Sequence, residues 1–176
     1  MKNIIFIVLF APMVFVHGQN FRGLDKSPMD KAAFPVQYKI SDKVAVITYS
    51  RPQLRGRTFN EIVPLNKVWR TGANEATELR IFKPIQMGGK KLDIGTYTLY
   101  TLFEEDNVTL IVNSDVNVWG AYRYDKNKDV ARVTVPLSKN NDAIEALSIA
   151  FASNTENPAL FMGWDDIRVK IPFSVL

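Results

Sequence analysis

The sequence predicts an all-β protein, a single antiparallel β-sandwich of roughly nine or ten strands with a long arginine-rich loop packed on it. Side chains alternate with a period of two in many short segments rich in β-branched and aromatic residues, which is typical of strands. Separators such as MGGKK, EEDN and DKNKD lie between these segments and indicate turns. No segment shows a sustained helical period.

The expected strands follow one another from residue 36 onward. They are centred on KVAVITYS, GTYTLYTLF, NVTLIVNS, ARVTVPLS, EALSIAF and IRVKIPF. In the last of these, the alternation places Ile167, Val169, Ile171 and Phe173 inside and Arg168 and Lys170 outside. The stretch SKNNDAIEALSIAF is expected to begin as a helical turn capped by Asn141 or Asp142 and to end as a strand.

The connection over residues 51–77 is too long to be a simple turn. It contains apolar anchors (Leu54, Phe59, Ile62, Val63, Val68, Trp69), so we expect an ordered loop. Several strands are apolar on both faces, as central strands are when a loop covers their outer side. This loop is the expected cover.

The two ends of the domain follow from composition. Lys2 precedes thirteen apolar residues, 4–16, and small or polar residues follow, which is typical of a secretory signal peptide. We expect a signal peptide over residues 1–18, an extended or partly disordered leader over 19–35, and one β-sandwich domain over 36–176. The expected location is the periplasm or the extracellular space, with no stable membrane anchor after cleavage and no cysteine to accept a lipid.

The composition excludes several classes of function. Residues 1–18 contain the one histidine, His17, and the sequence has no cysteine. The processed chain therefore lacks the imidazole and thiol groups of Ser-His-Asp and Cys-His catalysis and of typical zinc sites. We expect no cofactor, no disulfide and, because the small net positive charge is dispersed, no nucleic-acid partner.

Arginines cluster in the long loop. Arg51, Arg55, Arg57 and Arg70 fall within twenty residues, and guanidinium groups suit two-point contacts with carboxylates or phosphates. One hypothesis is a site for an acidic ligand. The other is that these side chains hold the loop in place by donating to its carbonyl groups and by pairing with nearby glutamates.

The segment VWRTGANEAT, residues 68–77, contains the remaining binding candidates. Trp69, Arg70, Asn74 and Glu75 resemble the contents of a sugar site, with an aromatic platform beside planar polar groups. Alternatively, Trp69 lies in the core and the polar residues cap a tight turn with Gly72 or Asn74 left-handed. The spacing of Tyr122 and Tyr124, after Trp119, predicts an aromatic strip on one strand face, whether exposed or buried.

Acidic residues offer two weaker hypotheses. Glu75 is the first candidate for a catalytic carboxylate, with Glu61 or Asp125 as its partner in a glycoside hydrolase. Asp125, Asn127 and Asp129 alternate as calcium ligands do, but the loop lacks the Gly and Glu of an EF-hand. A solvated turn explains these three residues better.

Three motifs point to a family. The run YSRPQLRGRTFNEIVPLNKVWRTGANEATEL, then GGKKLDIGTYTLYTLF and WGAYRYD, resembles the DUF2911 family over roughly residues 36–173. The resemblance implies an exported bacterial protein with a single domain. Because the function of that family is unknown, the resemblance supplies no site residues.

Three functions remain open from the sequence. The first is an exported, non-catalytic binding module for a glycan or acidic small molecule, with Arg51, Arg55, Trp69, Arg70, Asn74 and Glu75 at its site. The alternatives are a carboxylate-dependent hydrolase of envelope or extracellular glycans, and a structural envelope protein with no ligand. The sequence does not determine the ligand or the oligomeric state.

Overall fold

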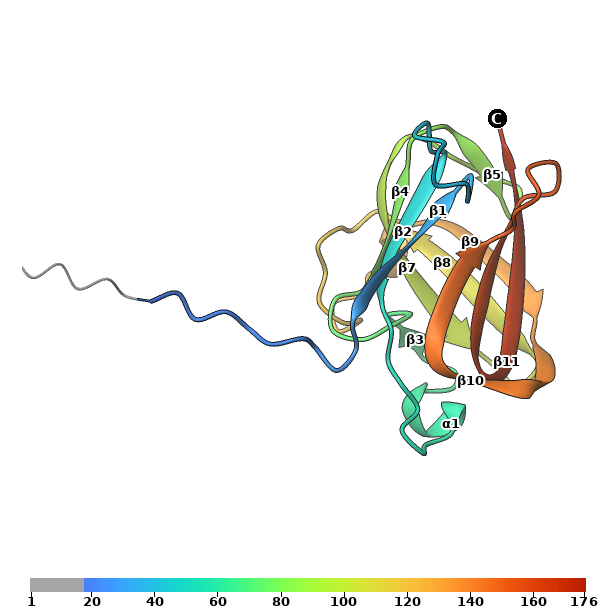
Figure 1. Cartoon of the computed structure of the whole chain (residues 1–176). Coiled ribbons are helices and arrows are strands. Elements are labelled where there is room, and N and C mark those ends of the chain that lie inside the picture. Colours follow the sequence, from blue (N-terminus) through green and yellow to red (C-terminus); the bar gives the residue numbers. More distant parts are fainter. Residues whose placement is uncertain (1–17) are drawn as a thin grey trace, which may run out of the picture.

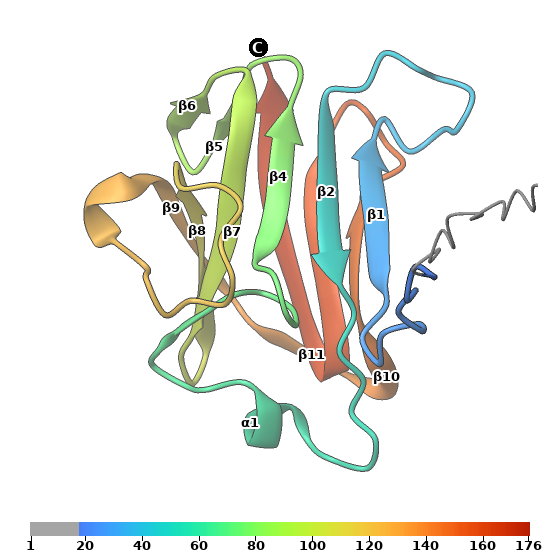
Figure 2. The ribbon, with the colours of Figure 1, turned by 90° about the vertical axis from the view of Figure 1, so that its left-hand side faces the viewer.

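Two antiparallel sheets pack face to face in the computed structural model, which describes residues 18–176. The first sheet has the strand order β1-β2-β4-β7-β8-β9, with β3 paired to β7, and the second has the order β10-β11-β5-β6 (Figures 1 and 2). The fold is thus the predicted all-β sandwich, with eleven strands among the described residues. The expected signal peptide lies outside them, apart from Gly18.

The bounds of the elements show why the strand count exceeds the prediction. Strands β3, β5 and β6 have only two or three residues, too few to show a period. The first sheet contains β1 (Met29–Phe34), β2 (Ala45–Ser50), β3 (Val68–Trp69), β4 (Thr77–Ile81), β7 (Gly95–Phe103), β8 (Asn107–Asn113) and β9 (Asp129–Pro136). The second contains β5 (Ile85–Met87), β6 (Lys90–Leu92), β10 (Ser138–Phe151) and β11 (Ala159–Val175). The helical elements are α1 (Phe59–Ile62) and a 3₁₀ turn, η1 (Lys126–Lys128).

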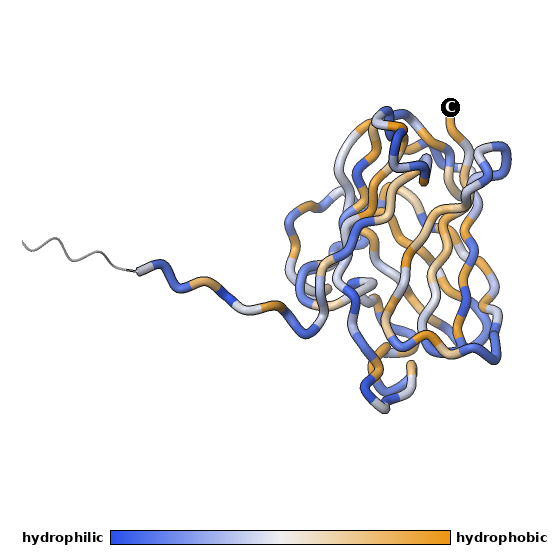
Figure 3. The backbone as a smooth tube through the Cα atoms, viewed as in Figure 1, coloured by the Kyte–Doolittle hydropathy of each residue, from blue (hydrophilic) through white to orange (hydrophobic). Residues whose placement is uncertain are grey.

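The core lies between the two sheets and follows from the alternation in the sequence. Ala45, Ile47 and Tyr49 of β2 are buried, as are the four residues of β11 predicted to face inward, whereas Lys170 is exposed. Hydrophobic residues lie along the strands and hydrophilic residues occupy many of the turns (Figure 3). The predicted faces of β11 are therefore confirmed.

Strand β10 differs from its prediction. The stretch expected to begin as a helical turn is extended throughout residues 138–151. It pairs with β11, and the register shifts twice, between Lys139 and Ile144 and between Ile144 and Ser148. Asn141 and Asp142 lie in this irregular part and cap no helix. The strand pairs with β11 on both sides of this part, and Asp142 N donates to Asn140 Oδ1 at 2.9 Å, so the local capping signal starts no helix.

The outer face of β7 and β8 is covered, but not by the predicted segment. Tyr100 of β7 packs edge-to-face on Tyr124, with ring centroids 5.2 Å apart, and Thr98 donates to the Asp115 carbonyl. The cover is therefore the connection between β8 and β9, residues 114–128. The arginine-rich loop instead lies at one end of the sandwich and along the β10 edge, where Gln53 pairs with Ala146.

The first sheet begins before the expected domain start at residue 36. Residues 29–34 form β1, which pairs with β2 along its whole length, and the leader before β1 is extended and exposed. No helix within residues 18–176 is long and apolar enough to cross a membrane.

Candidate functional site

Arg51 connects the edges of the two sheets. Its Nε donates to the Leu147 carbonyl at 2.9 Å and its second guanidinium nitrogen to Ser148 Oγ at 2.8 Å, both on β10. The remaining nitrogen contacts Asp30 of β1 at 3.0 Å. Each donor group of this side chain is thus used within the fold.

Arg55 and Arg57 also bind the loop itself. Arg57 donates to the carbonyls of Leu54 and Gln53 at 2.9 and 3.0 Å. Arg55 has a left-handed backbone, with φ at 52°, and its side chain donates to Gln53 Oε1 and to the Lys26 carbonyl. These bonds correspond to the structural interpretation of the arginine cluster.

Arg70 is different from the other three. Its Nε is buried, and no atom of residues 18–176 accepts a hydrogen bond from it. Nor does Arg70 take part in any ion pair among the described residues. Buried polar groups in proteins are nearly always paired, so an Arg70 without a partner is the main anomaly of the loop.

Trp69 belongs to the core. Only 5% of its surface is exposed, and its ring stacks on Trp164 at 5.9 Å with an interplanar angle of 12°. Phe103 and Phe59 complete the aromatic cluster, in which Phe59 packs edge-on against both Phe103 and Trp164. This tryptophan is therefore not an exposed platform for a sugar.

The turn after Trp69 is built by two left-handed residues, Thr71 and Asn74, with φ at 57° and 60°. Thr71 is fully buried and its hydroxyl contacts Thr101 of β7 at 3.1 Å. Gly72 lies so close to β2 that an added Cβ would be 3.0 Å from the Ser50 carbonyl oxygen. Of the two alternatives for a left-handed residue, Gly72 or Asn74, the structure has Asn74.

The turn is joined to the 114–128 connection by main-chain hydrogen bonds. Ala76 donates to the Val118 carbonyl at 3.0 Å, and Gly120 donates to the Asn74 carbonyl at 3.1 Å. Glu75 and Trp119 are consequently paired as in an antiparallel bridge. Two segments far apart in sequence, VWRTGANEAT and WGAYRYD, thus form one surface unit.

Two hollows lie beside this unit, and each is also lined by one residue of the 50–52 segment. The first, which we name the Arg70 groove, has a volume of about 430 Å³ and is lined by Pro52, Ile62, Pro64, Val68, Trp69, Arg70, Gly72, Ala121 and Tyr122. The second, the Glu75 hollow, has a volume of about 240 Å³ and is lined by Asn74, Glu75, Trp119, Ser50, Met29 and leader residues 22, 23, 25 and 27. The predicted site residues are therefore divided between two places. Arg51 and Arg55 line neither hollow.

The exposed aromatic residues of this surface are not Trp69, the residue predicted as an aromatic platform. Trp119 is 61% exposed and Tyr122 is 85% exposed, whereas Tyr124 turns inward onto Tyr100. Tyr122 and Tyr124 do not share a strand face, because residues 114–125 form no strand. The WGAYRYD motif contains these exposed aromatic residues, but only the tertiary structure separates them from Tyr124, which packs on Tyr100.

The acidic residues considered for catalysis have separate environments. Glu61 accepts hydrogen bonds from Thr58 N and Oγ1 at 2.7 and 2.8 Å, and these bonds hold the pKa of Glu61 below its usual value. Asp125 accepts from Asn127 N at the start of η1. Neither residue lines the Glu75 hollow, where the other carboxylate is Asp25 of the leader. The structure does not bring the predicted acid pairs together there.

The residues considered for calcium serve the fold. Asp129 accepts hydrogen bonds from Asn113 at 2.9 Å, Tyr124 at 2.6 Å and Arg132 at 2.7 Å. Burial and the hydrogen bond to Asp129 raise the pKa of Tyr124 to about 12. Within residues 18–176 no group of three or more acidic or histidine side chains is placed to hold a metal ion.

Comparison with known proteins gives one match. The family model described as "Protein of unknown function (DUF2911)" matches residues 27–173, which includes every strand of the sandwich except the last two residues of β11. No curated protein and no solved structure matches the chain. The match covers most of the sequence, and the chain therefore belongs to the DUF2911 family.

Proposed function

We propose that this protein is an exported binding module for an anionic glycan, and that the ligand binds in the Arg70 groove. The observation that carries the proposal is the Arg70 guanidinium, whose buried Nε has no hydrogen-bond partner in residues 18–176. A carboxylate or phosphate would supply the missing acceptors in two-point geometry.

The charge of the groove supports an anion. Arg70 is the one ionised residue among the nine that line it, and none of them is acidic. The positive charge is therefore not neutralised by a neighbour at the site. A negatively charged group would remain attractive even though the groove is open to solvent, and the attraction would weaken as salt increases.

The exposed aromatic ring supports a sugar rather than a bare anion. Tyr122 lines the same groove and is 85% exposed, and Trp119 lies at the adjoining hollow. Large aromatic side chains offer an apolar face with a polar end, which is the surface that sugar rings stack on. A saccharide with a carboxylate would use both Tyr122 and Arg70.

The proposal favours binding over hydrolysis. Glycoside hydrolysis by the usual route needs two carboxyl groups roughly 5 to 9 Å apart on either side of the bond, and the groove has none among its lining residues. A ligand held here would meet a cation and aromatic rings, but no general acid.

The test is a titration with two matched ligands. An oligogalacturonide and its methyl ester present the same rings with and without charge, and isothermal titration calorimetry measures both. We expect the acid to bind and the ester to bind at least about tenfold more weakly, because charge-assisted hydrogen bonds contribute about 1.5 to 3 kcal/mol.

Three variants assign the site. Arg70→Met, which keeps the aliphatic stem, should abolish the preference for the acid, and Tyr122→Ala should weaken both ligands. Arg80→Met is the control, since Arg80 is exposed and lies over the Phe82 ring at 5.0 Å. Equal affinity of wild type and Arg70→Met for the acid would overturn the proposal, as would no binding of either ligand at millimolar concentration.

A further inference from the structure

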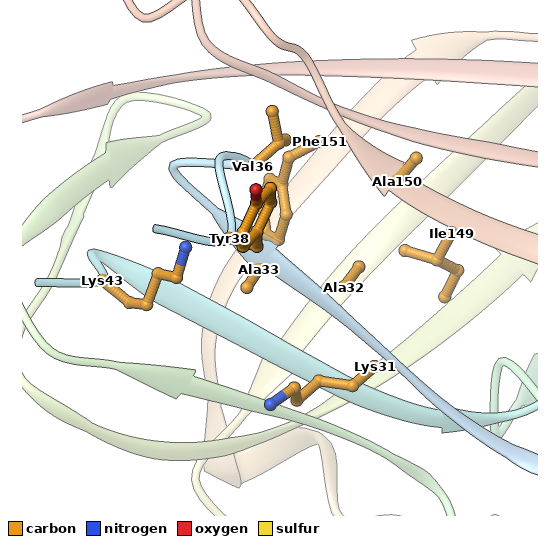
Figure 4. A pocket seen from close by; sticks show the side chains of 9 residues that line it. All are labelled: Lys31, Ala32, Ala33, Val36, Tyr38, Lys43, Ile149, Ala150 and Phe151. Carbon is orange, nitrogen blue, oxygen red and sulfur yellow. The ribbon is translucent and has the colours of Figure 1, made fainter. Parts of the chain in front are cut away.

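A third groove lies between the edges of the two sheets. It has a volume of about 500 Å³ and is lined by Lys31, Ala32, Ala33, Val36, Tyr38, Lys43, Ile149, Ala150 and Phe151 (Figure 4). One wall is β1, the edge of the first sheet, and the other is β10, the edge of the second. None of these residues lines the Arg70 groove.

On the edge of β10 that faces away from β11, every second residue is paired with another segment. Along this strand, residues 145, 147 and 149 direct their main-chain groups away from β11. The Glu145 carbonyl accepts from Leu54 N at 2.9 Å, and Leu147 N donates to the Pro52 carbonyl at 3.0 Å. Ile149 N donates to Tyr49 Oη at 2.9 Å, and the same hydroxyl contacts the Ile149 carbonyl at 3.3 Å.

This pairing stops at Phe151. Ala152 N donates to the Ala159 carbonyl within the hairpin, so the alternation of an antiparallel ladder turns the Phe151 main-chain groups away from β11. These groups face the groove that Phe151 lines. No hydrogen bond from another segment of residues 18–176 reaches them.

The edge of β1 is open at the same place. Arg51 N donates to the Pro28 carbonyl, and in the β1–β2 register this directs Asp30 and Ala32 toward β2. Lys31 and Ala33 then point their main-chain groups outward. The Lys31 amide donates to Asp30 Oδ1 at 2.7 Å. The Lys31 carbonyl and the amide and carbonyl of Ala33 then remain available for hydrogen bonds with an added strand.

The side chains of the groove combine an apolar floor with positive charge. Ile149 and Phe151 are buried, and Ala32 and Ala33 are partly buried. Lys31 has no ion-pair partner among the described residues, and Lys43 donates to the carbonyls of Pro35 and Gln37. No carboxylate lines the groove.

We propose that this groove binds an extended, acidic segment of a partner polypeptide, which adds as a strand to the open edge of β1 at Ala33. On its other side, the added backbone would supply hydrogen-bond partners to the outward main-chain groups of Phe151. Leu54, Pro52 and Tyr49 supply such partners to residues 145, 147 and 149 of the same strand. Alternate side chains of such a strand point to opposite faces, so apolar residues would enter the floor while acidic residues meet Lys31 and Lys43. Main-chain bonds of this kind give affinity, and the side chains give specificity.

The experiment uses three fluorescent heptapeptides, all tested on the intact protein by polarisation. One alternates Val and Glu, the second alternates Val and Lys, and the third is the Val–Glu peptide with alternate amides methylated. We expect the first to bind and the other two to bind at least about tenfold more weakly, because the Val–Lys peptide is repelled by Lys31 and Lys43 and the methylated peptide lacks main-chain donors. Amide hydrogen exchange should show the Ala33 and Phe151 amides slowed when the first peptide is bound.

Two variants and a control separate the contributions. Ala33→Pro removes one outward amide, which an edge strand tolerates, and Lys31→Glu reverses the charge. Both should weaken the first peptide at least about tenfold, while Lys126→Glu, on the exposed 3₁₀ turn, should not. Failure of the Val–Glu peptide to bind, equal binding of its methylated form, or unchanged exchange at Ala33 would each overturn the proposal.

Discussion

Replacing Arg51 by methionine should lower stability and leave ligand binding unchanged. Replacing Arg70 by methionine should weaken ligand binding and leave stability nearly unchanged. Methionine keeps the aliphatic stem, so each variant removes only the guanidinium group. Arg51→Met loses two hydrogen bonds to β10, at about 1 kcal/mol net each. It also loses the ion pair with Asp30, which contributes at most about 1 kcal/mol because 34% and 43% of the two side chains are exposed.

The expected destabilisation by Arg51→Met is therefore about 2 to 3 kcal/mol, or a fall of about 5 to 10 °C in Tm for a domain of this size. Arg70→Met breaks no bond within residues 18–176 and removes a buried donor without a partner. Its free energy of unfolding should stay within about 0.5 kcal/mol of the wild type. Urea unfolding followed by tryptophan fluorescence measures both.

The reasoning would be refuted if Arg70→Met were destabilised as much as Arg51→Met. In that case Arg70 would be a fourth structural arginine, and the binding proposal would lose its main support. Because both variants lose one positive charge, a general effect of net charge cannot produce the expected difference.

Three further predictions concern the core and the seam between the sheets. Trp69→Ala should cost about 3 to 5 kcal/mol in urea unfolding, because it leaves a cavity beside Trp164; a loss below 1 kcal/mol, about that of a surface change, would argue against the buried stack. Tyr49→Phe should cost about 1 to 3 kcal/mol, since it leaves the buried Ile149 amide without an acceptor, and exchange of that amide should accelerate; an unchanged rate would contradict the pairing. Stability should fall as pH rises from about 10, the unfolded pKa of Tyr124, toward its folded pKa of about 12, because only the unfolded state then loses the proton. Tyr124→Phe should reduce this alkaline loss in unfolding measured across pH, and an identical pH profile would exclude Tyr124 as its source.

The fold was predictable where burial on one face imposes a period. The inward residues of β11 were predictable because that strand is long enough to repeat the pattern. Strands β3, β5 and β6 were not, because two or three residues contain no period. The first half of β10 was mistaken for a helical turn because its extended state depends on pairing with β11, a contact distant in sequence.

The site was predictable only as a region. The sequence placed arginines and aromatic residues in the right segments, but their roles depend on which carbonyl or ring each one meets. Arg51 reaches β10, nearly a hundred residues away, and no local rule predicts that contact. Likewise Trp69 is buried and Trp119 exposed, although each is a tryptophan in a polar segment.

Strand β11 determines when the sandwich can be completed during synthesis. It pairs with β10 through residues 160–168 and with β5 through residues 173–175, so it joins the two parts of the second sheet. Because these residues emerge from the ribosome after every other strand, the inner face of the first sheet has no complete partner layer until then. Folding of the domain is therefore a late event with many long-range contacts, which makes it slow and leaves apolar surface exposed to chaperones in the meantime.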